Sequence, residues 1–185
     1  MKKEVKLVRS LHQKKFRNES GLFIVEGRKM VEEALNSHFR LHSLYTTDQH
    51  FANTMPEAIL ATQREMEMMS TLATAPQHIA VLYQNNETIK NLHSDQMILV
   101  LDGISDPGNM GTILRNADWF GVKKVMCTND CVELYNSKVV QSTMGSIFRV
   151  RVMYSEVSEI LDMLRKSQFG IAGAVMNGES LYESA

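Results

Sequence analysis

The sequence has few of the features that mark membrane proteins, disulfide-rich proteins or metal-binding proteins. Its 185 residues include only two cysteines, Cys127 and Cys131, which are too few for a disulfide framework. The pair also lacks the partner cluster that a zinc site needs, so we interpret both as core or surface thiols. No apolar run approaches the length that spans a bilayer. Residues 1–16 are basic but lack the continuous apolar stretch of a signal peptide, and we therefore expect a cytoplasmic protein without membrane contact.

Three common nucleotide and metal motifs are also missing. No G-x-G-x-x-G follows an expected strand, so the usual Rossmann phosphate loop is not indicated. Neither the Walker phosphate motif nor the H-E-x-x-H zinc motif occurs. The histidines are scattered along the chain, and we assign none of them to catalysis or to a metal.

Charge is unevenly distributed along a chain whose formal net charge is only −1. Residues 1–40 contain ten Lys and Arg against five Asp and Glu, which leaves +5, and residues 41–185 therefore carry −6. A basic segment on a neutral chain is typical of a surface that binds nucleic-acid phosphates. A solvated helix face would give the same pattern, and charge alone does not separate the two.

Short apolar runs alternate with helical patterns through the first 84 residues, which predicts a small α/β domain. The expected helices lie at 4–17, 28–37 and 64–72, and the expected strands at 22–25, 41–45, 58–61 and 79–83. The polar stretch 84–96 has no strong period and is the predicted domain boundary. We therefore expect one domain at 1–90 and a second at 96–185.

The second domain has strongly apolar expected strands, which predicts a parallel sheet covered on both faces. The strands are expected at 97–102, 124–127, 148–153 and 169–176, and the helices at 110–120, 137–143 and 156–167. Ligands of such sheets bind at the carboxyl ends of the strands.

The most informative segment is LDGISDPGNMGTILRNADWFG, residues 101–121, which leaves a strand and enters a helix. Asn109 is placed to cap that helix, and Gly111 permits close backbone approach at its first turn. The guanidinium of Arg115 is suited to gripping a phosphate oxygen. For an isolated Asn and Arg, a cap and a surface cation would be the simpler interpretation.

The fuller pattern resembles the first signature motif of the SpoU (TrmH-like) family of SPOUT RNA methyltransferases. The matching positions, in register, are Asp102, Asp106, Pro107, Asn109, Gly111, Ile113, Arg115, Ala117, Phe120 and Gly121. A second block, KVVQSTMGSIFRVRV at 138–152, is similar to the family's middle motif. Residues 14–35 are similar to the substrate-binding domain of many members, whose fold is like that of ribosomal protein L30e.

The resemblance implies an α/β protein: a small L30e-like domain that binds RNA, followed by a SPOUT (α/β knot) domain. It also implies transfer of a methyl group from S-adenosylmethionine to a ribose 2′-hydroxyl in rRNA or tRNA. From the residues themselves, we expect no metal. Asn109 and Arg115 are the catalytic residues that it implies, with Arg115 acting either as the base or as a phosphate ligand that stabilises charge. The expected RNA-binding residues are Lys14, Lys15, Arg17 and Arg28, and the family usually works as a homodimer.

The sequence departs from the family pattern at its end. The resemblance implies two further motifs, which complete the knot and most of the cofactor pocket, and we expect the chain to be truncated before them. Met176, at the end of the last expected strand, is the one residue to which we assign cofactor contact, with core packing as the alternative. A non-enzymatic RNA-binding module with a methyltransferase-like scaffold is the main competing hypothesis. A generic nucleotide-binding α/β protein is the third, and it leaves the basic N-terminal segment without a role.

Overall fold

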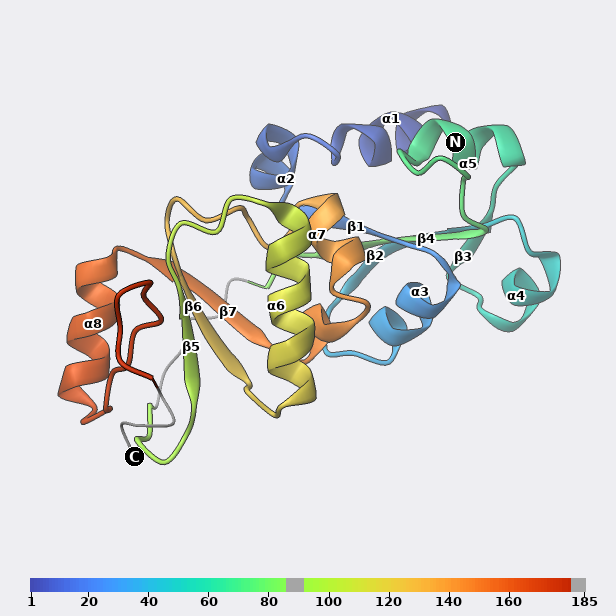
Figure 1. Ribbon diagram of the computed structural model, residues 1–185. Coiled ribbons are helices and arrows are strands. Elements are labelled where there is room, and N and C mark those ends of the chain that lie inside the picture. Colours follow the sequence, from blue (N-terminus) through green and yellow to red (C-terminus); the bar gives the residue numbers. More distant parts are fainter. Residues whose placement is uncertain (86–91, 181–185) are drawn as a thin grey trace.

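The computed structural model describes residues 1–85 and 92–180 and places them in two adjoining α/β units (Figure 1). The first unit contains a sheet ordered β1-β4-β2-β3, in which β4 runs antiparallel to both of its neighbours and β2 runs parallel to β3. Its strands are β1 (Leu22–Glu26), β2 (Leu41–Thr46), β3 (Ala58–Leu60) and β4 (His78–Tyr83). All of these strands were predicted, to within two residues at each end.

Helices cover both faces of this sheet. They are α1 (Lys2–Ser10), α2 (Lys14–Ser20), α3 (Arg28–Leu35), α4 (Gln49–Thr54) and α5 (Gln63–Met69). One core packs α1 and α5 against Ile24, Tyr45 and Ile79. The other core packs α3 against alternate residues of the same strands, such as Val25 and Leu44. The sheet is therefore buried on both sides, as its continuous apolar strands require.

Two helix predictions in this unit need correction. The single helix expected at 4–17 is broken into α1 and α2, because Leu11 turns into the core and is 1% exposed. The short helix α4 was not predicted. Its N-cap, Asp48, accepts hydrogen bonds from the backbone N–H groups of His50 and Phe51, which satisfies donors that a helix start otherwise leaves free.

The second unit has the predicted parallel sheet, ordered β5-β6-β7 in the described residues. Its elements are β5 (Ile98–Leu101), α6 (Pro107–Trp119), β6 (Lys124–Thr128), α7 (Ser137–Ser142), the 3-10 turn η1 (Ser146–Phe148), β7 (Arg151–Ser155) and α8 (Val157–Lys166). Buried residues of α6 and α7 pack against Val125 and Cys127 of β6. Ile160 and Leu164 of α8 pack against Met126 on the opposite face. Among residues 1–85 and 92–180, no helix combines the length and the apolar character that a membrane crossing requires.

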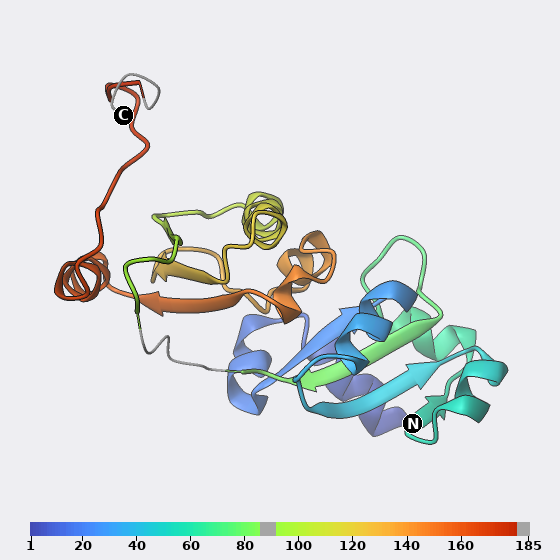
Figure 2. The same ribbon diagram turned by 90° about the horizontal axis from the view of Figure 1, so that it is seen from below.

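The strand expected at 169–176 does not form. This segment has no strand geometry, and Figure 2 shows it leading away from the sheet after α8. Val175 is 69% exposed and Met176 is fully exposed. A strand is stabilised by a paired edge and by cover on its faces, and in the described residues this apolar run meets neither.

A shared core joins the two units. Buried residues of β1 and α3 belong to the same hydrophobic cluster as α6 and α7. Phe23 of β1 lies with its ring centroid 4.6 Å from that of Tyr135, and Phe39 meets Phe148 edge to face at 5.6 Å. The predicted boundary at 84–96 falls partly on residues 86–91, outside the described residues, and the division at 1–90 and 96–185 stays a prediction.

Candidate active site and RNA-facing surface

The helix that carries the signature motif begins earlier than expected. Asp106 is its N-cap, and its Oδ1 accepts a hydrogen bond of 2.8 Å from the backbone N–H of Asn109. Pro107 occupies the first turn, where a missing N–H costs nothing. The prediction that Asn109 caps the helix is therefore wrong. Asn109 lies in the first turn with an exposed side chain, which leaves its amide available to a ligand.

Gly111 is required by the contact between α6 and α7. A Cβ atom built on Gly111 would lie 2.3 Å from the Cβ of Ser142 and 2.8 Å from its carbonyl carbon. Only a residue without a side chain fits so close to another backbone. The predicted close backbone approach is confirmed, and it presses the signature helix against the middle motif, to which Ser142 belongs.

Arg115 lies one turn and a half further along α6 with an exposed side chain. It lines a cavity of about 460 Å³ together with Trp119, Met144 and Arg149. In the described part of the chain, the Arg115 guanidinium has no carboxylate partner. Its donors are therefore free for an anionic ligand, which is the property that a phosphate-binding arginine needs.

The structure does not bring Asn109 and Arg115 together. They are six residues apart, which separates them by about 9 Å along the helix and about 120° around it. Asn109 does not line the cavity that Arg115 lines. The two side chains therefore lie on different faces of α6.

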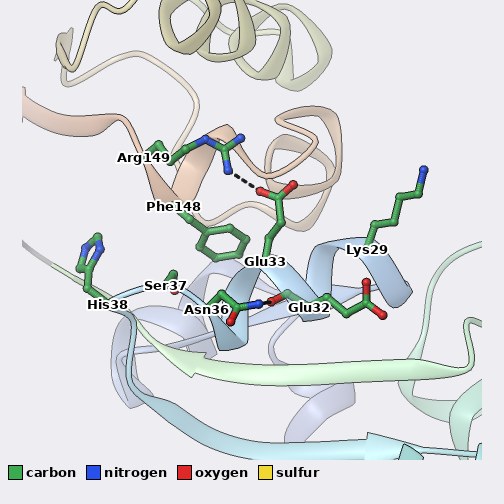
Figure 3. A pocket seen from close by; sticks show the side chains of 8 residues that line it. All are labelled: Lys29, Glu32, Glu33, Asn36, Ser37, His38, Phe148 and Arg149. Atoms are coloured by element: carbon green, nitrogen blue, oxygen red, sulfur yellow. Dashed lines mark hydrogen bonds and ion pairs between the residues drawn. The ribbon is translucent and has the colours of Figure 1, made fainter.

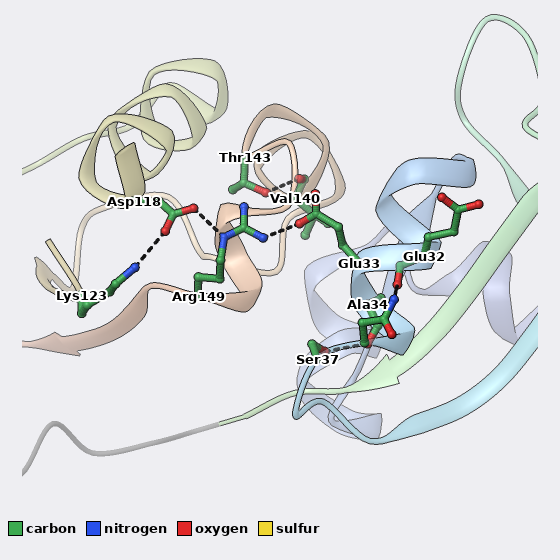
Figure 4. A network of polar contacts seen from close by, with 10 residues as sticks. Glu32, Glu33, Ala34, Ser37, Asp118, Lys123, Val140, Thr143 and Arg149 are labelled. Atoms are coloured by element: carbon green, nitrogen blue, oxygen red, sulfur yellow. Dashed lines mark hydrogen bonds and ion pairs between the residues drawn. The ribbon is translucent and has the colours of Figure 1, made fainter. Parts of the chain in front are cut away.

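Arg149 sits at the edge of the same cavity and joins the two units (Figure 4). Its guanidinium donates to the Glu33 carboxylate of α3 and, through Nε at 2.6 Å, to Oδ2 of Asp118 on α6. Lys123 holds the other Asp118 oxygen at 3.1 Å. Partial burial alone would raise the pKa of Asp118, but the hydrogen bonds from Arg149 and Lys123 outweigh it and lower that pKa.

This network was not predicted. Glu33 and Arg149 are 116 residues apart, and nothing local to either residue pointed to an ion pair. The contact depends on how the two units pack. It also explains Gly145, where an added Cβ would lie 2.0 Å from a Glu33 carboxylate oxygen.

One of the expected RNA-binding residues is wrong. Arg17 is 2% exposed, and its guanidinium donates to Glu133 and, over 2.7 Å, to the carbonyl of Leu11. A buried cation is stable only when it is paired and hydrogen-bonded, and Arg17 is both. It holds the two units together and does not face a ligand.

The other expected RNA-binding residues are exposed. Lys14 projects from α2, and Lys15 lies 3.9 Å from Glu19. Arg28 donates to Glu32 on its own helix at 2.8 Å. These side chains remain open to solvent, and their role in RNA binding stays a prediction.

Side chains at and after the carboxyl end of β6 accept hydrogen bonds from the backbone that follows β5. Thr128 accepts from the backbone N–H of Gly103 at 3.0 Å, and the Cys131 sulfur accepts from that of Ile104 at 3.2 Å. Both cysteines are free and buried, which favours core thiols over surface thiols, and burial raises the pKa of Cys127. Among the described residues, no buried side-chain donor here lacks a partner. Met176 does not end a strand, and its contact with the cofactor stays a prediction.

Comparison with known proteins gives consistent matches over both units. The SpoU rRNA Methylase family model matches residues 96–185, and the MRM3-like substrate binding domain model matches residues 2–90. The 23S rRNA (guanosine(2553)-2′-O)-methyltransferase RlmP of Bacillus subtilis is 28% identical over 97% of this chain and 73% of its own length.

Solved structures match equally widely. A putative RNA methyltransferase of the TrmH family from Porphyromonas gingivalis is 31% identical, with a TM-score of 0.89 over 99% of this chain and 74% of its own. An RNA 2′-O ribose methyltransferase is 25% identical, with a TM-score of 0.82 over 98% of this chain and 74% of its own. The signature motif on α6, the parallel sheet behind it and these matches together show that this chain belongs to the SpoU (TrmH) family of RNA methyltransferases.

Proposed function

We propose that this protein transfers a methyl group from S-adenosylmethionine to a ribose 2′-hydroxyl of RNA, with ribosomal RNA as the favoured substrate and transfer RNA as the alternative. The observation that carries the proposal is Arg115, an exposed guanidinium without a carboxylate partner in the described residues, on the helix that bears the family's signature motif. The names of the relatives, which specify 2′-O-methylation, support the choice of the ribose oxygen.

The role of Arg115 follows from its chemistry. A guanidinium stays protonated in proteins, so it is a poor base. It is well suited to bind the phosphate next to the target ribose and to stabilise negative charge that develops on the 2′-oxygen. Asn109, one turn and a half before it, offers an amide that can donate to and accept from the nucleotide.

The cofactor supplies the methyl group. The backbone N–H groups of Gly103 and Ile104, which follow β5, already donate to Thr128 and Cys131. Contact of Met176 with the cofactor stays a prediction, and we derive only how the protein contacts RNA.

Trp119 and Phe120 support the further proposal that the protein works as a homodimer. They are 85% and 79% exposed at the end of α6, and Trp119 lines the Arg115 cavity. Two large aromatic side chains side by side in water are typical of a surface that another protein covers. Light scattering of the wild type and of the double variant Trp119→Ser, Phe120→Ser tests this, because a dimer that uses this surface should dissociate in the variant.

The experiment that tests the proposed activity uses radiolabelled S-adenosylmethionine and ribosomal RNA with the full-length protein. Nucleoside analysis by mass spectrometry should find a methyl group on ribose, and a methyl group on a base would contradict the proposal. Arg115→Ala should lower the rate by about 100-fold or more, as removal of a charge-stabilising donor does in other enzymes. Arg64→Ala, an exposed arginine on α5, is the matched control.

A non-enzymatic RNA-binding module remains the competing hypothesis. It predicts RNA binding without methyl transfer and without heat of binding when S-adenosylmethionine is titrated into the protein. Wild-type transfer rates in Arg115→Ala would reject the catalytic assignment while leaving the family membership intact.

A further inference from the structure

Arg40 and Tyr83 form a stacked pair at the edge of the first unit. The guanidinium carbon of Arg40 lies 3.6 Å from the centre of the Tyr83 ring. The backbone fixes this arrangement, because the N–H of Tyr83 donates to the carbonyl of Arg40 at 3.0 Å. The Arg40 side chain is exposed and Tyr83 is half-buried, so the outer face of the stack is open to solvent.

The charge of Arg40 is not used by the fold. Arg17, Arg28 and Arg149 each donate to a carboxylate. Arg40 has no such partner within residues 1–85 and 92–180. Its guanidinium stacks on the Tyr83 ring, which leaves its donors available to an anion.

A second ring completes the cluster. The ring centroid of His42 lies 5.6 Å from that of Tyr83, in an edge-on arrangement. The pairing of β2 with β4 shifts register between Leu41 and Ser43, which places a bulge at His42. Bulges of this kind change the direction of a side chain and are frequent beside functional sites.

The cluster is connected to Arg115 by adjoining cavities. Arg40 and Tyr83 line a cavity of about 280 Å³ that also includes His38. His38 lines a second cavity, of about 510 Å³, together with Arg149 (Figure 3). Arg149 in turn lines the cavity of Arg115. We call this row of cavities, from Arg115 to Arg40, the junction groove.

Charge along the junction groove is positive at its ends and balanced in its middle. The middle cavity is lined by two cations, Lys29 and Arg149, and by two carboxylates, Glu32 and Glu33, so it offers little net attraction to phosphate. Arg115 and Arg40 are the guanidinium groups without carboxylate partners in the described residues that line it. A ligand that is held at both ends and runs between them fits this distribution.

We propose that Arg40 and Tyr83 form a stacking site for an unpaired RNA base that flanks the methylated nucleotide. The inference rests on the proposed function, because Arg115 fixes where the target lies. Single-stranded RNA is recognised through bases stacked on aromatic rings and on guanidinium planes. In the Arg40–Tyr83 pair, the ring holds such a guanidinium plane in place. The RNA strand runs from Arg115 along the junction groove, and one of its bases stacks on the outer face of the Arg40 guanidinium.

The test measures binding of a fluorescein-labelled, unstructured RNA of about 12 nucleotides by anisotropy with the full-length protein. Arg40→Ala and Tyr83→Leu should each weaken binding about tenfold, the loss of one stacked base. Tyr83→Phe keeps the ring and should bind as the wild type does, which separates lost stacking from misfolding. Arg64→Ala removes an equal charge on α5 and should not change the dissociation constant.

A probe that carries 2-aminopurine reports stacking directly. Its fluorescence should be quenched on binding to the wild type and to Tyr83→Phe, and not to Tyr83→Leu. The stacking site would be rejected if Arg40→Ala and Tyr83→Leu bound RNA with the same dissociation constant as Arg64→Ala. An equal loss for a blunt duplex of the same sequence would also reject it, because that loss reports backbone charge and not an unpaired base.

Methyl transfer measured on the same preparations separates this inference from the proposed function. If the wild type transfers methyl groups and its RNA binding does not depend on Arg40, the stacking site is rejected and the proposed activity is retained. Binding that depends on Arg40 and Tyr83, without any transfer by the wild type, rejects the proposed activity and retains the stacking site.

Discussion

The guanidinium of Arg17 on α2 lies buried between the two units and donates through Nε to Oε1 of Glu133 at 2.6 Å. These residues are 116 positions apart, and the contact links α2 to the loop between β6 and α7. Glu133 is 20% exposed at its side chain, so the pair is largely removed from water. Arg17, which belongs to the basic N-terminal segment, therefore has a structural role.

Loss of either partner of this pair should destabilise the protein. Glu133→Gln leaves the Arg17 charge buried and uncompensated, and the free energy of unfolding should fall by about 3 kcal/mol. Urea denaturation measures the change. Lys15→Ala, which removes an exposed cation 3.9 Å from Glu19, is the control and should change stability by less than about 0.5 kcal/mol. Equal effects of the two substitutions would show that the Arg17 pair contributes nothing beyond a surface contact.

Gly111→Ala should separate α6 from α7. The added methyl group would lie 2.3 Å from the Cβ atom of Ser142 and 2.8 Å from its carbonyl carbon. These atoms cannot move away without a shift of the backbone, so the free energy of unfolding should drop by about 1–3 kcal/mol. Gly170→Ala makes the same substitution where nothing lies within 4 Å and serves as the matched control. Thermal unfolding of both variants compares them directly. A Gly111→Ala protein as stable as Gly170→Ala would contradict the close helix contact.

Asp106 and Asn109 should separate stability from activity. Asp106→Ala removes the N-cap of α6 and should cost about 1 kcal/mol of stability. Asn109→Ala leaves the cap in place, so unfolding should be unchanged while methyl transfer falls. Denaturation and transfer rates measured on both variants test this. If Asn109→Ala lost stability and kept its transfer rate, the residue would have a structural role alone.

His78 should make the protein less stable in mild acid. The ring is 1% exposed, its Nδ1 lies 3.0 Å from the hydroxyl of Thr46, and its Nε2 has no partner among the described residues. Burial lowers the pKa of His78, partly offset by the nearby Asp48 carboxylate and reinforced by Arg28. The unfolded chain therefore binds this proton at a higher pH than the folded protein does.

The sign of the effect follows from that difference. Stability contributed by neutral His78 is present above the unfolded pKa, which is about 6.5, and is lost as pH falls below it. The free energy of unfolding should decline between about pH 7.5 and pH 5 in the wild type. His78→Gln, which cannot titrate, should show a smaller decline, and His42→Gln, at an exposed position, should behave as the wild type. Identical pH profiles for wild type and His78→Gln would exclude His78 as the cause.

The sequence determined most of the elements and the identity of the site. Short continuous apolar runs located the strands of both sheets, and helical spacing of apolar residues located α3, α5, α6, α7 and α8, because burial is a local demand on the chain. The motif around Asn109 and Arg115 indicated the family and the activity, because its residue types and spacings all lie in one continuous segment. The close approach at Gly111 was likewise readable from one residue.

Tertiary structure alone decided which charges face a ligand. Arg17 resembles its neighbours Lys14 and Lys15 in sequence, yet it is buried because Glu133 reaches it from the other unit. Arg149 joins Glu33 and Asp118 for the same reason, and Arg40 is left with Tyr83. The strand expected at 169–176 failed because an apolar run becomes a strand only where an edge and a covering layer exist to receive it. Side-chain partners far apart in the sequence depend on the packing of whole elements, and no local pattern encodes them.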